Sequence, residues 1–159
     1  MKRNLDLTTT VVKQLVKAGK SVSVAESITG GGLGAAITDV AGSSKIFLGG
    51  AITYSDLSKT KILEVPKRLI TKHSAVSEEV AKAMAEGVRQ LYKSDFAIST
   101  TGTAGPGKAY GKSAGTVWIA IASKSETIAV ELLIAGDRAT VRKSTIESAL
   151  ATFSRILGA

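Results

Sequence analysis

Residues 21–34 read SVSVAESITGGGLG, and this stretch is the starting point for interpreting the whole chain. Its first five residues alternate serine with apolar side chains, a pattern typical of a β-strand. An acid, a hydroxyl and a glycine cluster follow, and a helix-like run begins at Leu33. Such a corner places Ser27 at the carboxyl end of a strand and beside a helix N-terminus, where backbone N–H groups can bind an anion or an oxyanion.

Helical and extended patterns alternate along the rest of the chain. Apolar spacing predicts helices over residues 7–17, 32–39, 55–63, 77–92 and 137–157. It predicts strands over residues 21–25, 46–54, 95–101, 116–122 and 127–134, the second of them buried. This order predicts an α/β fold whose mixed, mainly parallel sheet has helices on both faces and contains an antiparallel hairpin. No linker or repeat interrupts the sequence, so we expect one domain over residues 1–159.

Composition restricts the classes of partner. The net charge of +8 favours anionic partners. Only 4% of the residues are aromatic and the basic residues are scattered, so a solvated basic surface is the first interpretation. If the charge serves a partner, a phosphorylated small molecule fits it as well as nucleic acid does. The chain has no cysteine, which excludes disulfides and thiolate ligands. With His73 as the single histidine and no tight cluster of carboxylates, we expect no metal site.

The sequence gives no indication of a membrane protein. No apolar run approaches the ~20 residues that a membrane-spanning helix needs. The first six residues, MKRNLD, lack the apolar core of a signal peptide. We therefore expect a cytoplasmic protein without a membrane partner.

Ser27 is a candidate nucleophile, and a serine hydroxyl needs a nearby base. A Ser-His-Asp triad would have to recruit His73, which we place in a polar loop away from the strand ends. A lysine desolvated by burial is the other kind of base. Lys59 follows the second strand in a loop that should meet Ser27 at one edge of the sheet, yet spacing alone does not distinguish it from Lys61 or from a surface lysine.

Two arginines open the last predicted helix. Asp137 and Arg138 stand at its start and Arg142 lies one turn later. A helix-capping aspartate with two solvated arginines is one interpretation. An arginine pair directed at a phosphate is the other, because the planar guanidinium matches phosphate oxygens.

Seven stretches, taken together, resemble the C-terminal domain of the CinA family of competence/damage-inducible proteins, which includes stand-alone nicotinamide mononucleotide amidases. They occur in the family's order and extend across the chain from about Leu7 to Leu157. In sequence order the stretches are AESITGG (25–31), TDVAGSS (38–44), YSDLSK (54–59), HSAVSEEV (73–80), TGTAGP (101–106), GTVW (115–118) and GDR (136–138).

This resemblance implies a three-layer α/β/α sandwich with a mixed sheet. It implies a hydrolase that removes ammonia from the carboxamide of nicotinamide mononucleotide and needs no cofactor. Ser27 would be the nucleophile, Lys59 its base, and Arg138 the partner of the substrate phosphate. The remaining residues implied at the site are Tyr54 and Thr101 as catalytic groups and Thr29, Gly30, Gly31 and Gly102 as substrate-binding groups, with backbone donors at residues 29–31 holding the oxyanion.

The chain departs from the family pattern at a few positions. Thr103 stands where the family usually has isoleucine, and Asp56 where it usually has asparagine. The segment Gly107–Ala114 carries two lysines in place of an acid and a proline. If this segment contacts the base or ribose, substrate preference changes with it.

Two other functions stay open. A catalytically silent nucleotide-binding or regulatory module would tolerate the altered segment. A nucleic-acid-associated protein is suggested by the basic charge and by the family's competence naming. Small α/β domains of this kind often associate, and we expect a homo-oligomer.

Overall fold

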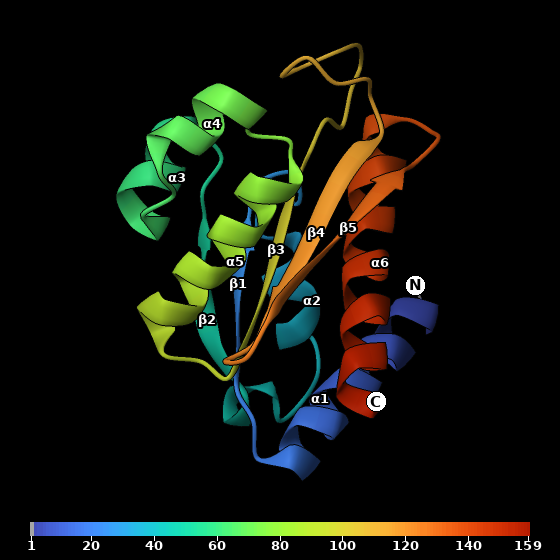
Figure 1. Cartoon of the computed structure of the whole chain (residues 1–159). Helices are drawn as coiled ribbons and strands as arrows, with labels where there is room; N and C mark the ends of the chain where they lie inside the picture. The colour runs from blue at the N-terminus through green and yellow to red at the C-terminus, as the bar shows by residue number, and fades with distance from the viewer. Residues whose placement is uncertain (1) are drawn as a thin grey trace.

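The computed structural model describes residues 2–159 and has alternating helices and strands (Figure 1). The ends of the predicted elements lie within two residues of the predicted ones, except at the N-terminus of the first helix, which begins five residues earlier. In chain order the elements are α1 (Lys2–Ala18), β1 (Val22–Glu26), α2 (Gly32–Thr38), a 3-10 turn (Ser43–Lys45), β2 (Phe47–Ile52), α3 (Asp56–Leu63), α4 (Lys67–His73), α5 (Glu78–Tyr92), β3 (Phe96–Gly102), β4 (Thr116–Ala122), β5 (Thr127–Leu133) and α6 (Arg138–Gly158).

The five strands form one sheet in the order β2-β1-β3-β4-β5. β1 pairs in parallel with β2 and with β3, whereas β3–β4 and β4–β5 are antiparallel. The sheet is therefore mixed, as predicted, but its pairings divide evenly rather than being mainly parallel. β2 is an edge strand whose residues alternate between partial and full exposure, so the expectation of a buried strand there is wrong.

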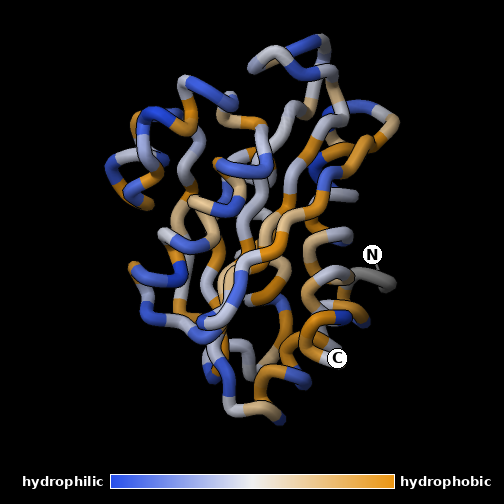
Figure 2. Tube along the Cα trace, viewed as in Figure 1, coloured by the Kyte–Doolittle hydropathy of each residue, from blue (hydrophilic) through white to orange (hydrophobic). Residues whose placement is uncertain are grey.

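Helices lie on both faces of the sheet. α1, α2 and α6 cover one face and α3, α4 and α5 the other (Figure 1). Each face has its own cluster of buried apolar side chains. In Figure 2 the strands are largely apolar, while the helices mix hydrophilic and hydrophobic residues along their length. An apolar strand layer between amphipathic helices is what an α/β fold requires.

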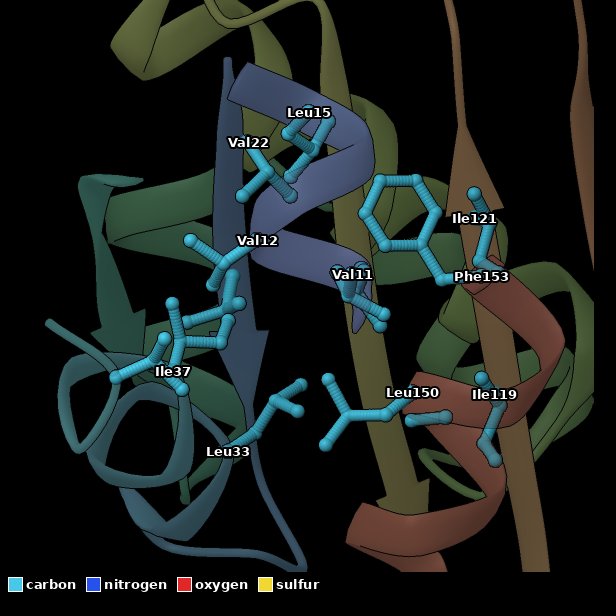
Figure 3. Close-up of a cluster of buried hydrophobic side chains, with 14 of the residues drawn as sticks. Val11, Val12, Leu15, Val22, Leu33, Ile37, Ile119, Ile121, Leu150 and Phe153 are labelled. Atoms are coloured by element: carbon cyan, nitrogen blue, oxygen red, sulfur yellow. The ribbon is translucent and has the colours of Figure 1, made fainter. Parts of the chain in front are cut away.

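The face covered by α1, α2 and α6 carries large side chains. Figure 3 shows Leu15 of α1, Phe153 of α6 and Ile121 of β4 among them. α1 and α6 lie side by side, and the Gln14 side chain both donates to the Ser154 carbonyl (3.2 Å) and accepts from its hydroxyl (2.9 Å). These contacts fix the two terminal helices against the sheet.

The face covered by α5 carries small side chains. Ala25, Ala97, Ala120 and Ala122 are buried there beneath α5. The Ser99 hydroxyl donates to the Ala81 carbonyl of α5 at 2.6 Å. Small residues allow a helix to approach the sheet closely, so α5 supports the strands from which the loops of the site emerge.

The connections from β1 set the position of the site. The chain leaves β1 through α2 on one face to reach β2, and returns through α3–α5 on the other face to reach β3. β1 therefore lies where the chain direction along the sheet reverses. In open α/β sheets ligands bind beyond the carboxyl ends of the strands at such a reversal.

Candidate active site

The corner after β1 is anchored by Glu26. This side chain is buried, and its carboxylate accepts N–H groups from Gly31 (3.0 Å), Leu33 (2.9 Å) and Gly34 (2.8 Å). The first N–H groups of a helix have no partner inside the helix and favour a nearby negative charge. Glu26 supplies both the acceptors and the charge, and so it fixes α2 against the end of β1.

Glu26 occupies the donors that the sequence suggested for an oxyanion. The Gly31 N–H donates to Glu26, and the Gly30 N–H donates to the Ser27 carbonyl at 3.1 Å. The Thr29 hydroxyl donates to Glu26 as well, at 2.6 Å. Gly30 and Gly31 have positive φ (58° and 102°), so their contribution here is the shape of the turn. Within residues 2–159, the backbone N–H groups of Ile28 and Thr29 have no hydrogen-bond acceptor.

Arg142 braces the same corner. Its guanidinium donates to the Ile28 carbonyl and to the Thr29 carbonyl, both at 3.1 Å. Two N–H groups of this guanidinium are thus used in holding the turn. The idea that it forms a phosphate-directed pair with Arg138 does not fit this geometry, and Arg142 instead holds the two consecutive peptides whose carbonyls belong to Ile28 and Thr29.

Lys59 lies beside Ser27. Ser55 caps α3, with its hydroxyl accepting from the Ser58 N–H, and this places Lys59 one turn into the helix. The Lys59 side chain is 1% exposed, and its amine nitrogen is 3.1 Å from the Ser27 Oγ. Lys61 is exposed, so the structure separates the two lysines that spacing could not.

Burial lowers the pKa of the Lys59 amine, and the nearby Asp56 carboxylate opposes part of that shift. Desolvation disfavours the charged form of a lysine. A lowered pKa increases the fraction of neutral amine near pH 7, which is the form that can accept a proton.

The Lys59 amine has three hydrogen-bonding neighbours, and when protonated it donates to all of them, the Ser27 hydroxyl included. Its other two contacts are backbone carbonyls, those of Thr53 (2.9 Å) and Tyr54 (3.3 Å). A neutral amine has two N–H donors and one lone pair. With both donors given to carbonyls, the lone pair is left for the third neighbour, the Ser27 hydroxyl.

A pocket of about 330 Å³ opens over Ser27. Besides Ser27, its lining consists of Ile28, Tyr54, residues 102–107, Ala109, Tyr110 and the exposed Arg138. Arg138 is the only charged residue in this lining among the residues that the structure describes. Its guanidinium donates to the Gly105 carbonyl (2.8 Å) and to the Tyr54 hydroxyl (3.2 Å).

Two residues considered from the sequence lie outside this pocket. The buried Thr101 hydroxyl donates to the Ala75 carbonyl at 2.8 Å, so it holds the strand end against the segment before α5. His73 is the last residue of α4, and its Nδ1 lies 3.4 Å from a Glu79 carboxylate oxygen. Neither side chain contacts Ser27 or Lys59. Gly102, by contrast, lines the pocket, whereas Thr29, Gly30 and Gly31 do not.

The described part of the chain was searched for two other features, a cluster of metal ligands and a membrane-spanning helix. No group of three His, Cys, Asp or Glu residues is placed to hold a metal ion there. Over the same residues, no helix has the length and hydropathy that crossing a membrane demands.

Comparison with known proteins agrees with this arrangement. The family described as "CinA C-terminal domain" matches residues 4–157. The chain belongs to the CinA C-terminal domain family. A CinA-like protein of Geobacter sp. (strain M21) is 47% identical over 137 residues, which is 86% of this chain and 33% of that protein. A CinA-like protein of Synechococcus sp. (strain CC9311) is 55% identical over 100 residues, 63% of this chain and 24% of that one.

Solved structures of the CinA family have the same fold. The competence damage-inducible protein A of Klebsiella pneumoniae is 36% identical, with a TM-score of 0.95 over 98% of this chain and 97% of that one. The competence/damage inducible protein CihA of Agrobacterium tumefaciens is 31% identical, with a TM-score of 0.93 over 98% and 96%. This chain spans about a third of the length of the curated relatives it matches first.

Proposed function

We propose that this CinA-family chain is an amidohydrolase that converts nicotinamide mononucleotide to nicotinate mononucleotide and ammonia. The observation that carries the proposal is the buried Lys59 amine, 3.1 Å from the Ser27 hydroxyl and with a lowered pKa. A serine with a neutral amine at hydrogen-bond distance is an activated nucleophile. The particular substrate rests on the resemblance of the motifs to the family's amidases.

Proton transfer follows from the contacts of Lys59. The Ser27 hydroxyl gives its proton to the Lys59 lone pair as Oγ bonds to the amide carbon. The resulting ammonium keeps its hydrogen bonds to Thr53 and Tyr54, and its new N–H faces the reacting centre. That proton goes to the amide nitrogen as the C–N bond breaks, and ammonia leaves. Water then hydrolyses the acyl-enzyme, with Lys59 taking the water proton and returning it to Ser27.

The oxyanion needs donors beside Ser27. We assign this role to the backbone N–H of Ile28, which donates to no other described group and belongs to a residue that lines the pocket. Arg142 holds the Ile28 carbonyl and Glu26 holds the Gly31 N–H, so the turn that carries the donor is braced before substrate binds. One such preorganised donor contributes roughly 3–4 kcal/mol to the transition state.

The substrate phosphate is assigned to Arg138. As the charged group in the described lining, it faces the pocket from the first turn of α6, where Asp137 accepts the Thr140 N–H at 2.8 Å and caps the helix. A guanidinium binds phosphate through paired N–H donors. On substrate binding, the hydrogen bonds of Arg138 to Gly105 and Tyr54 would be shared with phosphate oxygens.

The test is ammonia release from nicotinamide mononucleotide. Wild type should release ammonia, and Ser27→Ala should lose at least about 10³-fold in kcat, because no other described hydroxyl contacts Lys59. Ser125→Ala, on the exposed turn between β4 and β5, is the matched control and should keep full activity. Binding of the nucleotide without ammonia release would instead support the silent nucleotide-binding module. Full activity of Ser27→Ala would overturn the serine mechanism.

A further inference from the structure

The segment between β3 and β4 forms a small hairpin at the mouth of the pocket. Ala109 and Lys112 exchange backbone hydrogen bonds of 3.1 and 2.9 Å, with Tyr110 and Gly111 between them. Both central residues have positive φ, 55° and 71°, as in a type I′ turn. The segment projects at the top of Figure 1.

Neighbouring segments hold this hairpin in place. The buried Thr103 hydroxyl donates to the Ala109 carbonyl at 3.0 Å. The Ser74 hydroxyl, before α5, donates to the Tyr110 carbonyl at 3.0 Å. The backbone at Tyr110 is thus supported at two consecutive carbonyls, so the fold sets where this residue stands in the pocket lining.

Tyrosine is an unusual residue for this turn. Positive φ at both central positions favours asparagine, aspartate or glycine, because a large side chain strains a left-handed backbone. A strained residue that its neighbours hold in place often serves a site. Tyr110 is one of two aromatic residues in the pocket lining, the other being Tyr54.

Among residues 2–159, the Tyr110 side chain has no hydrogen-bonding or ring-stacking partner. It is 50% exposed, and within the described residues its hydroxyl makes no hydrogen bond and its ring stacks on no other ring. The Tyr54 hydroxyl, by contrast, accepts a hydrogen bond from Arg138. The Tyr110 ring is therefore a free aromatic surface in the lining of a pocket that Ser27 and Arg138 also line.

We propose that Tyr110 is a specificity-determining residue whose ring stacks on the flat heteroaromatic ring that carries the scissile carboxamide. The substrate class is then an aromatic carboxamide linked to an anionic group, with Ser27 at the amide, Tyr110 on the ring and Arg138 at the anion. The assignment rests on the proposed amidase function. It adds the selection of a planar ring, which neither Ser27 nor Arg138 can provide.

Two variants separate the effect of the Tyr110 ring on binding from its effect on the conformation of the turn. Tyr110→Asn removes the ring and keeps a residue that accepts positive φ, and Tyr110→Phe keeps the ring and removes the hydroxyl. Their Kd values are measured by calorimetry for nicotinate mononucleotide and for ribose 5-phosphate, a probe that has the anion and no aromatic ring. KM and kcat are measured with nicotinamide mononucleotide.

Stacking of a base on an aromatic side chain contributes to the binding free energy. Tyr110→Asn should therefore raise the KM for nicotinamide mononucleotide and the Kd for nicotinate mononucleotide, each roughly tenfold. Its kcat and its Kd for ribose 5-phosphate should stay at the wild-type values, and Tyr110→Phe should resemble wild type in every measurement. Wild-type affinity of Tyr110→Asn for nicotinate mononucleotide would overturn the proposal. An equal loss for both ligands would overturn it too, since it would assign Tyr110 to the shape of the loop.

The two proposals fail in different ways. If wild type released no ammonia, the amidase function would be wrong, and the ratio of Kd values between Tyr110→Asn and Tyr110→Phe would still decide the role of the ring. If wild type released ammonia and the variants had equal KM and Kd, the amidase would stand and the stacking would be wrong. Absence of binding of nicotinate mononucleotide to wild type would overturn the role of Tyr110.

Discussion

In the proposed mechanism, the protonation state of Lys59 decides the activity of the site. Because burial lowers the pKa of its amine, kcat/KM should rise with pH and reach its plateau below the ordinary range of a lysine. Lys59→Arg should lose about 10²–10⁴-fold in kcat/KM at every pH, since a guanidinium does not deprotonate in proteins and cannot act as a base. The pH–rate profile with nicotinamide mononucleotide is the measurement.

Lys61→Arg is the matched control, because Lys61 lies on the same helix and is exposed. It should reproduce the wild-type profile. A wild-type kcat/KM that rises only in the ordinary titration range of a lysine, or wild-type activity in Lys59→Arg, would contradict the role of Lys59 as base.

At this scale the sequence predicted some residues of the site and missed others. The motif resemblance selected Ser27 and Lys59, which the structure brings to hydrogen-bond distance. It also suggested the N–H groups of residues 29–31 as oxyanion donors, and there it neglected Glu26. The signal was present, since an acid at the end of an apolar strand has to be buried and paired. Which donors it pairs with depends on the backbone path of the turn, which no local pattern specifies.

Helix α2 is an element whose start depends on one side chain from outside it. Three N–H groups at its N-terminus donate to the Glu26 carboxylate. In Glu26→Gln one oxygen becomes an N–H₂ group that faces N–H donors instead of accepting from them. Leaving a buried donor unpaired costs about 1–3 kcal/mol, so the free energy of unfolding should fall by at least that amount. Urea unfolding followed by circular dichroism measures it.

The same substitution should lower kcat, because the turn that Glu26 holds also carries Ser27. Glu86→Gln, at an exposed position of α5, is the control and should change neither quantity. Unchanged stability of Glu26→Gln would mean that α2 does not depend on this carboxylate.

Two elements show where local patterns fail. α4 was not predicted, because its only apolar side chains are the partly buried Leu69 and Ile70, too few to give a helical period. Its start follows Pro66, which suits the beginning of a helix. β2 reads as apolar throughout and was expected to be buried. Its place at the edge of the sheet leaves Leu48 and Ile52 exposed, and edge position is a property of strand order rather than of the strand.

For the whole molecule, strand order determines where the chemistry lies. Sequence patterns predicted an α/β fold and the β4–β5 hairpin because both are local. They overestimated the parallel pairings, because the antiparallel pairing of β3 with β4 depends on the long loop that also carries Tyr110. That loop both reverses the chain direction and lines the pocket. The same segment therefore determines a strand pairing and carries the residue proposed to determine specificity.

The buried lysine should also make the stability of the whole molecule depend on pH. The pKa of Lys59 is lower in the folded state than in the unfolded chain. Between those two values the unfolded chain binds more protons, so the free energy of unfolding rises with pH, by at most about 1.4 kcal/mol per pH unit. Lys59→Met has a similar length, cannot titrate, and should lack this contribution.

The quantity to measure is the free energy of unfolding of wild type minus that of Lys59→Met, from urea titrations at several pH values between 6 and 9. Taking the difference cancels the titration of groups that do not interact with Lys59. The difference should favour the variant more at low pH and shift towards wild type as pH rises. A difference that is constant with pH would mean that Lys59 keeps its ordinary pKa in the folded protein, and a lysine that stays protonated there could not serve as the base for Ser27.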